Sequence, residues 1–254
     1  MTVPDSDLSR RRRELYESTA ALYTATFHII WRVGFPHVHA WLTDALHDRP
    51  VILDAGAGSG YWSRHIARTE PRRLVVAMDF SHAYVTRTQA FIPEDLGVAV
   101  VQGDVTAAPF PAASFDAILC SGVLDTMPDP VPALSELRRL LRRDGRLLLI
   151  LRSRGSRAST LIEKVFRSSI SMFRWLTRRE GGDLDPELWS RTAISPRLAE
   201  YADSAGLVVD VVHYGRLLTR ASLSPRDAAA HSKERGSDED NNVDTGEGQD
   251  GSGV

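Results

Sequence analysis

Alternating glycines follow a short apolar run and an acid in "VILDAGAGSG", residues 51–60. The acid is Asp54, and the glycines are Gly56, Gly58 and Gly60. Glycine can adopt positive φ angles and has no β-carbon to hold a ligand away, so backbone N–H groups in such a turn can lie against a bound molecule. The stretch therefore predicts a ligand-binding turn between a strand and a helix.

Two familiar glycine-rich loops for phosphate groups do not match this turn. The dinucleotide-binding pattern G-x-G-x-x-G would place its third glycine at position 61, where the chain has Tyr61. A phosphate-binding P-loop would continue with Gly-Lys-Ser/Thr, and no lysine lies nearby. Tyr61 therefore disfavours a pyrophosphate ligand, and the missing lysine excludes a P-loop.

Polar residues also end the next apolar runs along the chain. Asp79 closes "LVVAMD", Asp104 closes "VAVVQGD", and Ser121 and Gly122 close "FDAILCSG". In an open parallel sheet the ligand crevice lies beyond the carboxyl ends of the strands, where the winding direction reverses. We therefore expect these residues to lie together, beside the glycine-rich turn.

In this order and spacing, the residues resemble motif I and the following ligand positions of class I S-adenosylmethionine-dependent methyltransferases. The run "VTAAPFPAASFDAILCSGVLDTMPDP" resembles the small-molecule branch with a methyltransferase type 11 domain, which includes the ubiquinone and menaquinone biosynthesis methyltransferases. "YESTAALY", residues 16–23, resembles the segment that closes over the cofactor in that branch. The resemblance implies S-adenosylmethionine as cofactor and a small, apolar methyl acceptor such as a quinone, polyketide, phenol or lipid.

The resemblance also implies a role for individual residues. Asp79 would accept hydrogen bonds from the ribose hydroxyls, and Asp104 would accept one from the adenine amino group. The full set of cofactor-binding residues that it implies is Tyr16, Tyr23, Asp54, Ala55, Gly56, Gly58, Asp79, Phe80, Asp104, Val105 and Ser121. Taken singly, each has a structural alternative, such as a tight turn, a helix cap or a core contact.

A general base is not identified by the sequence. Thr126 stands where many relatives in the branch carry a histidine, and Ala113 replaces a small polar residue. His28 is a weak candidate because it lies near "YESTAALY", and the other candidates are His37, His39, His82 and His213. A phenol, an enolised ring carbon or an amine could accept a methyl group without such a base.

Several motifs of other methyltransferases are missing. Enzymes that methylate amino groups of nucleic acids carry Asp/Asn-Pro-Pro-Tyr/Phe after the fourth strand, which here reads "SGVL". Cytosine C5 enzymes use a Pro-Cys nucleophile, whereas Cys120 follows a leucine and is expected to be a buried strand residue. We therefore expect no nucleic-acid partner and, with a single cysteine, no multi-cysteine metal site.

Apolar runs alternate with helical patterns, which indicates a parallel sheet covered on both faces. The expected fold is α/β, a Rossmann-like doubly wound seven-stranded sheet of the class I methyltransferase type. Its last two strands would form a hairpin that turns at Gly215. The expected helices are 60–69, 81–91, 131–142 and one within 195–207, and the expected strands before the hairpin are 51–54, 74–79, 98–104, 115–122 and 146–152.

Five regions are expected. Residues 1–47 would form N-terminal helices closing over the cofactor, and 48–152 the cofactor-binding core. Residues 153–194 carry a basic amphipathic pattern that we interpret as a cap over the acceptor, in preference to an ordinary packed helix. Residues 195–225 would complete the sheet, and 226–254 would be a disordered acidic tail.

Composition bounds the remaining expectations. The sequence has 43% hydrophobic and 25% charged residues and a net charge of −2. It shows neither the pattern of a signal peptide nor an apolar run of about 18 residues, so the chain is expected to be soluble and cytoplasmic. Contact of its basic stretches with a membrane surface is a less favoured alternative, and the oligomeric state is not determined. Two other functions stay open: cofactor binding without methyl transfer, and a nicotinamide-dependent oxidoreductase, which Tyr61 disfavours.

Overall fold

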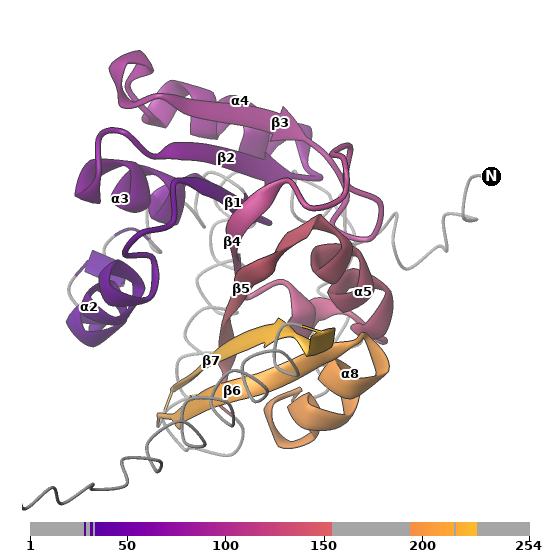
Figure 1. Cartoon of the computed structure of the whole chain (residues 1–254). Helices are drawn as coiled ribbons and strands as arrows, with labels where there is room; N and C mark the ends of the chain where they lie inside the picture. Colours follow the sequence, from indigo (N-terminus) through magenta and orange to yellow (C-terminus); the bar gives the residue numbers. More distant parts are fainter. Residues whose placement is uncertain (1–27, 29–30, 33, 154–193, 216, 228–254) are drawn as a thin grey trace, which may run out of the picture.

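A seven-stranded sheet with helices on both faces forms the body of the protein (Figure 1). The computed structural model describes residues 28, 31–32, 34–153, 194–215 and 217–227. Four predictions concern residues that lie wholly or largely outside these ranges: the roles of Tyr16 and Tyr23, the N-terminal helices that would close over the cofactor, the expected cap, and the acidic tail.

The strand order is β3-β2-β1-β4-β5-β7-β6. Strands β1 to β5 pair in parallel, and β7 runs antiparallel to both β5 and β6. This arrangement confirms the expected doubly wound sheet and its terminal hairpin. The strands are β1 (Val51–Ala55), β2 (Leu74–Asp79), β3 (Val98–Gln102), β4 (Phe115–Ser121), β5 (Leu141–Arg152), β6 (Leu207–Tyr214) and β7 (Leu218–Pro225).

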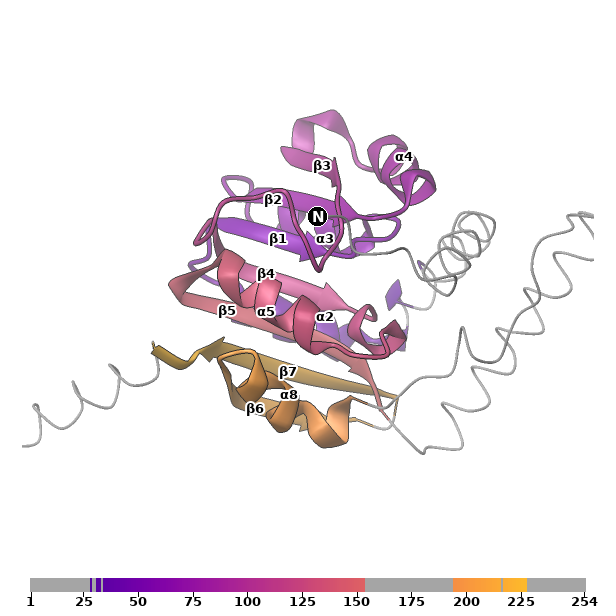
Figure 2. The ribbon, with the colours of Figure 1, turned by 90° about the vertical axis from the view of Figure 1, so that its right-hand side faces the viewer.

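Helices α2 and α3 lie on one face of the sheet, and α5 and α8 lie on the other (Figure 2). None of the helices in the described ranges has the length and apolar character needed to cross a membrane. The described α-helices are α2 (Pro36–Ala45), α3 (Tyr61–Thr69), α4 (His82–Phe91), α5 (Val131–Leu140) and α8 (Leu198–Ser204), with short 3-10 turns η1 (Glu94–Leu96), η2 (Leu124–Thr126) and η3 (Ser195–Arg197).

Side chains of β1 point alternately into the buried clusters on the two faces of the sheet. Ile52 belongs to the buried cluster that includes residues of α2 and α3, whereas Leu53 and Ala55 belong to the cluster that includes residues of α5 and α8. Successive side chains of a strand point to opposite faces, so Asp54 faces the same side as Ile52. The acid of the glycine-rich turn is thereby directed toward α3.

The predicted strand 98–104 ends earlier, at Gln102, so Asp104 follows the strand. The largest boundary error lies between α5 and β5. The sequence indicated a helix to residue 142 and a strand from 146, but α5 ends at Leu140 and β5 begins at Leu141. Leu141 pairs with Phe115, the register shifts between Phe115 and Ala117, and Arg142 forms an ion pair with Asp116. Because of these contacts with β4, the basic residues after Leu141 belong to the sheet, although their sequence pattern is typical of the end of a helix.

Arg73 links three elements at the amino ends of β1 and β2. It is 8% exposed, and its guanidinium donates to the carbonyl oxygens of Arg49 (3.0 Å), Ile66 (3.3 Å) and Leu46 (2.7 Å). We expect Arg73→Met to lower the free energy of unfolding by roughly 2–4 kcal/mol, because buried carbonyl groups lose their donors. Urea denaturation measures this, with the exposed neighbour Arg72→Met as control; equal effects of the two variants would contradict it.

Candidate functional site

The glycine-rich turn connects β1 to α3 in a conformation that favours glycine. Gly56 has a φ of 77° and Gly58 one of 56°, both in the left-handed region. A β-carbon on Gly56 would collide with the side chain of Val123, which follows β4. A β-carbon on Gly58 would meet no atom of the described chain within 4 Å. The turn is therefore packed against the β4 loop at Gly56 and open at Gly58.

The backbone N–H groups of the turn donate within the protein. Gly56 N and Ala57 N both donate to Met78 O, at 2.8 and 2.9 Å, and Gly60 N donates to Ala57 O at 2.9 Å. Gly58 N donates to the side chain of Asp79 at 2.8 Å. Our expectation that these N–H groups face a ligand was therefore wrong, because the turn folds back onto the end of β2.

Asp79 lies at the carboxyl end of β2 and is buried. Its Oδ2 accepts from Gly58 N, and its Oδ1 accepts from Ser81 N at 3.0 Å. Phe80, the next predicted residue, is half-buried, and its carbonyl oxygen accepts from Gln102.

Asp54 is buried beneath the turn, and Ser63 Oγ of α3 donates to its Oδ2 at 2.5 Å. Burial raises the pKa of the Asp54 carboxyl to about 7, against the opposing effect of the hydrogen bonds from Ser63. A positively charged ligand placed nearby would favour the ionised form. Ala55, the next predicted residue, is fully buried on the opposite face of the sheet.

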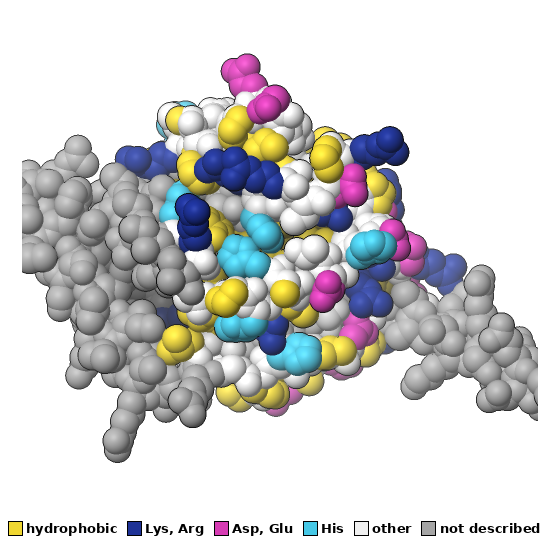
Figure 3. Space-filling model, turned by 90° about the vertical axis from the view of Figure 1, so that its left-hand side faces the viewer, with side chains coloured by type: hydrophobic (Ala, Val, Ile, Leu, Met, Phe, Trp, Pro, Cys, Tyr) yellow, Lys and Arg dark blue, Asp and Glu magenta, His cyan; other side chains and the backbone are white. Residues whose placement is uncertain are grey.

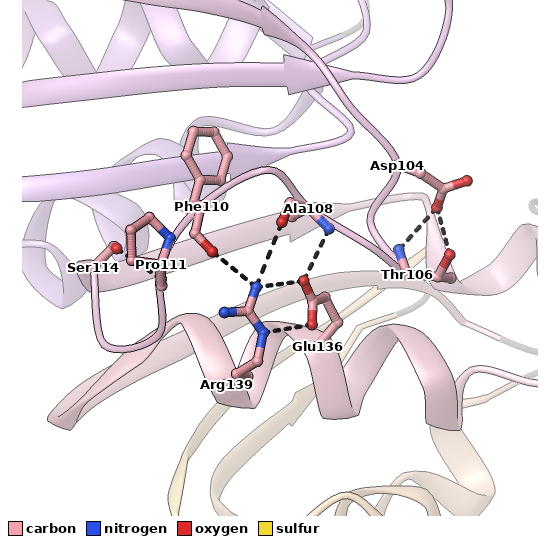
Figure 4. A network of polar contacts seen from close by, with 8 residues as sticks. All are labelled: Asp104, Thr106, Ala108, Phe110, Pro111, Ser114, Glu136 and Arg139. Atoms are coloured by element: carbon pink, nitrogen blue, oxygen red, sulfur yellow. Dashed lines mark hydrogen bonds and ion pairs between the residues drawn. The ribbon is translucent and has the colours of Figure 1, made fainter. Parts of the chain in front are cut away.

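Asp104 follows β3 and is exposed (Figure 4). Its Oδ1 accepts from both the backbone N and the hydroxyl of Thr106, at 2.8 and 2.7 Å. Its Oδ2 takes no hydrogen bond from the part of the chain that the structure describes and is available to a donor from outside. Val105, predicted beside it, is buried.

The end of β4 and the described segment after it carry one thiol, two hydroxyls and the carboxylates of Asp125 and Asp129, of which Asp129 is exposed. The Cys120 thiol is fully buried, and burial raises its pKa, which confirms the expectation of a structural strand residue. Thr126 Oγ1 donates to Val123 O at 2.6 Å. Asp125 is buried and accepts from Arg152 N at 2.8 Å. Ser121 is half-buried at the end of the strand.

His28 lies against the glycine-rich turn rather than free in a cleft. Its Nε2 is 2.7 Å from Ser59 Oγ, and its ring packs against those of Phe91 and Tyr61. Burial, and then the charge of Arg64, lower the pKa of its imidazole. The role of Ser59 was missed in the sequence, because nothing in its local pattern indicates a partner 31 residues away.

Histidine side chains gather on one face of the molecule (Figure 3). The candidate His39 lies in α2 and is half-buried. It contacts Trp31 O at 3.1 Å, Tyr61 OH at 3.1 Å and His65 Nδ1 at 3.4 Å. The remaining candidates, His37, His82 and His213, are exposed.

Residues 53–149 match the family model of the methyltransferase domain. A demethylmenaquinone methyltransferase from Beutenbergia cavernae is 38% identical over 145 residues, which are 56% of this chain and 54% of that protein. An uncharacterized chloroplastic methyltransferase from Arabidopsis thaliana is 34% identical over 101 residues, 37% of this chain and 29% of that protein. The matches thus span less than two thirds of either relative.

A solved structure agrees in fold. Human N-acetylserotonin methyltransferase superposes with a TM-score of 0.61 at 16% identity, over 88% of this chain and 60% of that one. Residues 53–149 of the chain thus carry a methyltransferase domain. S-adenosylmethionine is the cofactor of such a domain, and the nicotinamide-dependent alternative falls away.

The site of this methyltransferase domain fits its cofactor on physical grounds. A pyrophosphate would need free backbone N–H groups at the turn, whereas those of Gly56, Ala57, Gly58 and Gly60 donate internally. An adenosyl sulfonium carries no phosphate and is positively charged, so it suits carboxylates at successive strand ends. The turn therefore offers backbone without side chains at its glycines, close to the carboxylates that end the neighbouring strands.

Asp54 should make the stability of the domain depend on pH. Its folded pKa of about 7 lies above the value of 3.8 for an exposed aspartate carboxyl, so the folded state holds the proton more tightly than the unfolded state and loses stability as the pH rises. We expect Asp54→Asn to gain about 2–3 kcal/mol in unfolding free energy relative to the wild type between pH 5 and pH 8.

Urea denaturation at pH 5, 6, 7 and 8 measures this difference. Ser63→Ala is the matched variant: it removes the hydrogen bond that lowers the folded pKa of Asp54, so the loss of stability should continue to a higher pH than in the wild type. Parallel profiles for Asp54→Asn and the wild type would contradict the expectation.

Proposed function

We propose that this chain transfers a methyl group from S-adenosylmethionine to a small, apolar acceptor. The observation that carries the proposal is the arrangement of Asp79 and Asp104 at the carboxyl ends of two neighbouring strands, beside a turn whose N–H groups are already bonded. In this proposal Asp79 accepts from the ribose hydroxyls, and Asp104 Oδ2 accepts from the adenine amino group.

When bound, S-adenosylmethionine would supply an electrophilic methyl carbon to an electron pair of the acceptor, either a lone pair on oxygen or nitrogen or the π pair of an enolised ring carbon, with S-adenosylhomocysteine as the leaving group. The residues of the chain align the reactants and exclude water. Ser121 and Gly122, at the end of the central strand β4, are proposed to border the reacting atoms. Asp54 lies beneath the turn, where its ionised form would stabilise positive charge.

An apolar acceptor is supported by two observations. The described segment after β4 includes two half-buried apolar residues, Val123 and Met127, and Thr126, whose hydroxyl donates to the backbone. The relative from Beutenbergia cavernae is a demethylmenaquinone methyltransferase. Since Thr126 takes the place of a histidine after β4 and its hydroxyl is bonded to the backbone, we propose an acceptor that ionises easily or reacts as a neutral nucleophile: a quinol, a phenol or an amine.

Cofactor binding tests the site directly. Calorimetry with S-adenosylhomocysteine should show binding by the wild type, and Asp79→Ala should weaken it at least tenfold, because it removes charged hydrogen bonds to the ribose and the anchor of the turn. Asp95→Ala, an exposed acid in η1, is the control and should bind as the wild type does. Binding of NAD instead of S-adenosylhomocysteine would refute the proposal.

Turnover tests the transfer itself. The wild type should transfer labelled methyl to at least one member of a panel of demethylated quinols, phenols, polyketides and lipids. A chain that binds S-adenosylhomocysteine tightly but methylates none of these acceptors would support cofactor binding without transfer.

A further inference from the structure

The loop that carries Asp104 is fastened to α5 by two side chains (Figure 4). Glu136 Oε1 accepts from Ala108 N at 2.9 Å. Arg139 Nη2 donates to Phe110 O at 2.9 Å and approaches Ala108 O at 3.5 Å. Two segments that are 28 to 31 residues apart in the chain are thus joined by one pair of charged side chains.

The two side chains also hold each other. Arg139 Nη2 donates to Glu136 Oε1 at 2.7 Å, and Arg139 Nε donates to Glu136 Oε2 at 2.8 Å. This two-pronged geometry fixes the planes of both groups. The hydrogen bonds from Arg139 lower the pKa of the Glu136 carboxyl, so it is ionised at neutral pH. The Glu136 side chain is only 13% exposed, which limits screening by water.

The position of Ala108 is transmitted to Asp104 through a short, rigid turn. Asp104 and Ala107 form an isolated antiparallel bridge, and Ala107 N donates to Asp104 O at 3.1 Å. Inside the turn Asp104 Oδ1 is saturated by Thr106. Val105 and Ala108 are buried in the core that includes α5, so the turn cannot rotate freely. The direction of Asp104 Oδ2 therefore depends on where α5 holds Ala108.

We propose that Glu136 and Arg139 are positioning residues for adenine recognition, and that they set the preference of the site for a purine with a 6-amino group. The inference rests on the proposed function, because it assumes that Asp104 Oδ2 accepts from that amino group. Neither residue touches the cofactor: both act by fixing the loop on which Asp104 lies.

The test compares two ligands on the full chain by calorimetry: S-adenosylhomocysteine and S-inosylhomocysteine, in which a carbonyl oxygen replaces the 6-amino group. The wild type should prefer the adenine ligand by roughly tenfold or more, the usual effect of a hydrogen bond to a charged group. Arg139→Met should weaken binding of the adenine ligand by roughly tenfold and of the inosine ligand less, so that the preference falls toward one.

Arg138→Met is the matched control. Arg138 neighbours Arg139 on α5, but its ion pair is with Asp227 and it makes no contact with the loop among the described residues. It should keep the wild-type preference. Glu136→Gln provides a second variant in case Arg139→Met folds poorly: its amide oxygen can still accept from Ala108 N, so it should retain an intermediate preference.

Three outcomes are distinguishable when melting temperatures are measured alongside. A lower preference in Arg139→Met and Glu136→Gln, but not in Arg138→Met, supports the inference. Equal weakening of both ligands, or a lower melting temperature with an unchanged preference, would overturn it and leave a purely structural role. If the wild type binds neither ligand, the proposed function itself fails.

Discussion

The carboxylate of Asp79 joins the two segments on which the cofactor site depends. It accepts the N–H of Gly58 from the glycine-rich turn and the N–H of Ser81 from the start of α4. Two further N–H groups of the turn donate to Met78 O, one residue earlier in β2. The turn is thus tied to the end of the neighbouring strand, and its shape depends on the parallel pairing of β1 with β2.

The reversal of winding at β1 places a second constraint on the site. Strand β1 lies between β2 and β4, so the turn has the end of β2 on one side and the β4 loop on the other. On the β4 side Val123 leaves no room for a β-carbon at Gly56. At Gly58 a β-carbon would meet no other atom of the described chain, so the positive φ of this residue is what favours glycine there. Three adjacent parallel strands therefore determine what surrounds the turn.

Electrostatics, rather than a reactive side chain, distinguishes this site. The single thiol is buried with a raised pKa, and the hydroxyl after β4 is bonded to the backbone. What the site does offer is carboxylate charge at the strand ends and a buried acid, Asp54, that titrates near neutral pH. Such a site favours a cationic ligand that brings its own reactivity, which agrees with a methyltransferase domain.

The sequence by itself determined the sheet, its hairpin and the strand ends that carry Asp54, Asp79 and Asp104. Apolar periodicity and glycine conformation act among near neighbours in the chain, so they can be read without coordinates. The tertiary structure decided where the N–H groups of the turn point, which residue His28 meets, and how Glu136 reaches Ala108. These partners are separated by about 20 to 31 residues, and only packing brings them within hydrogen-bond distance.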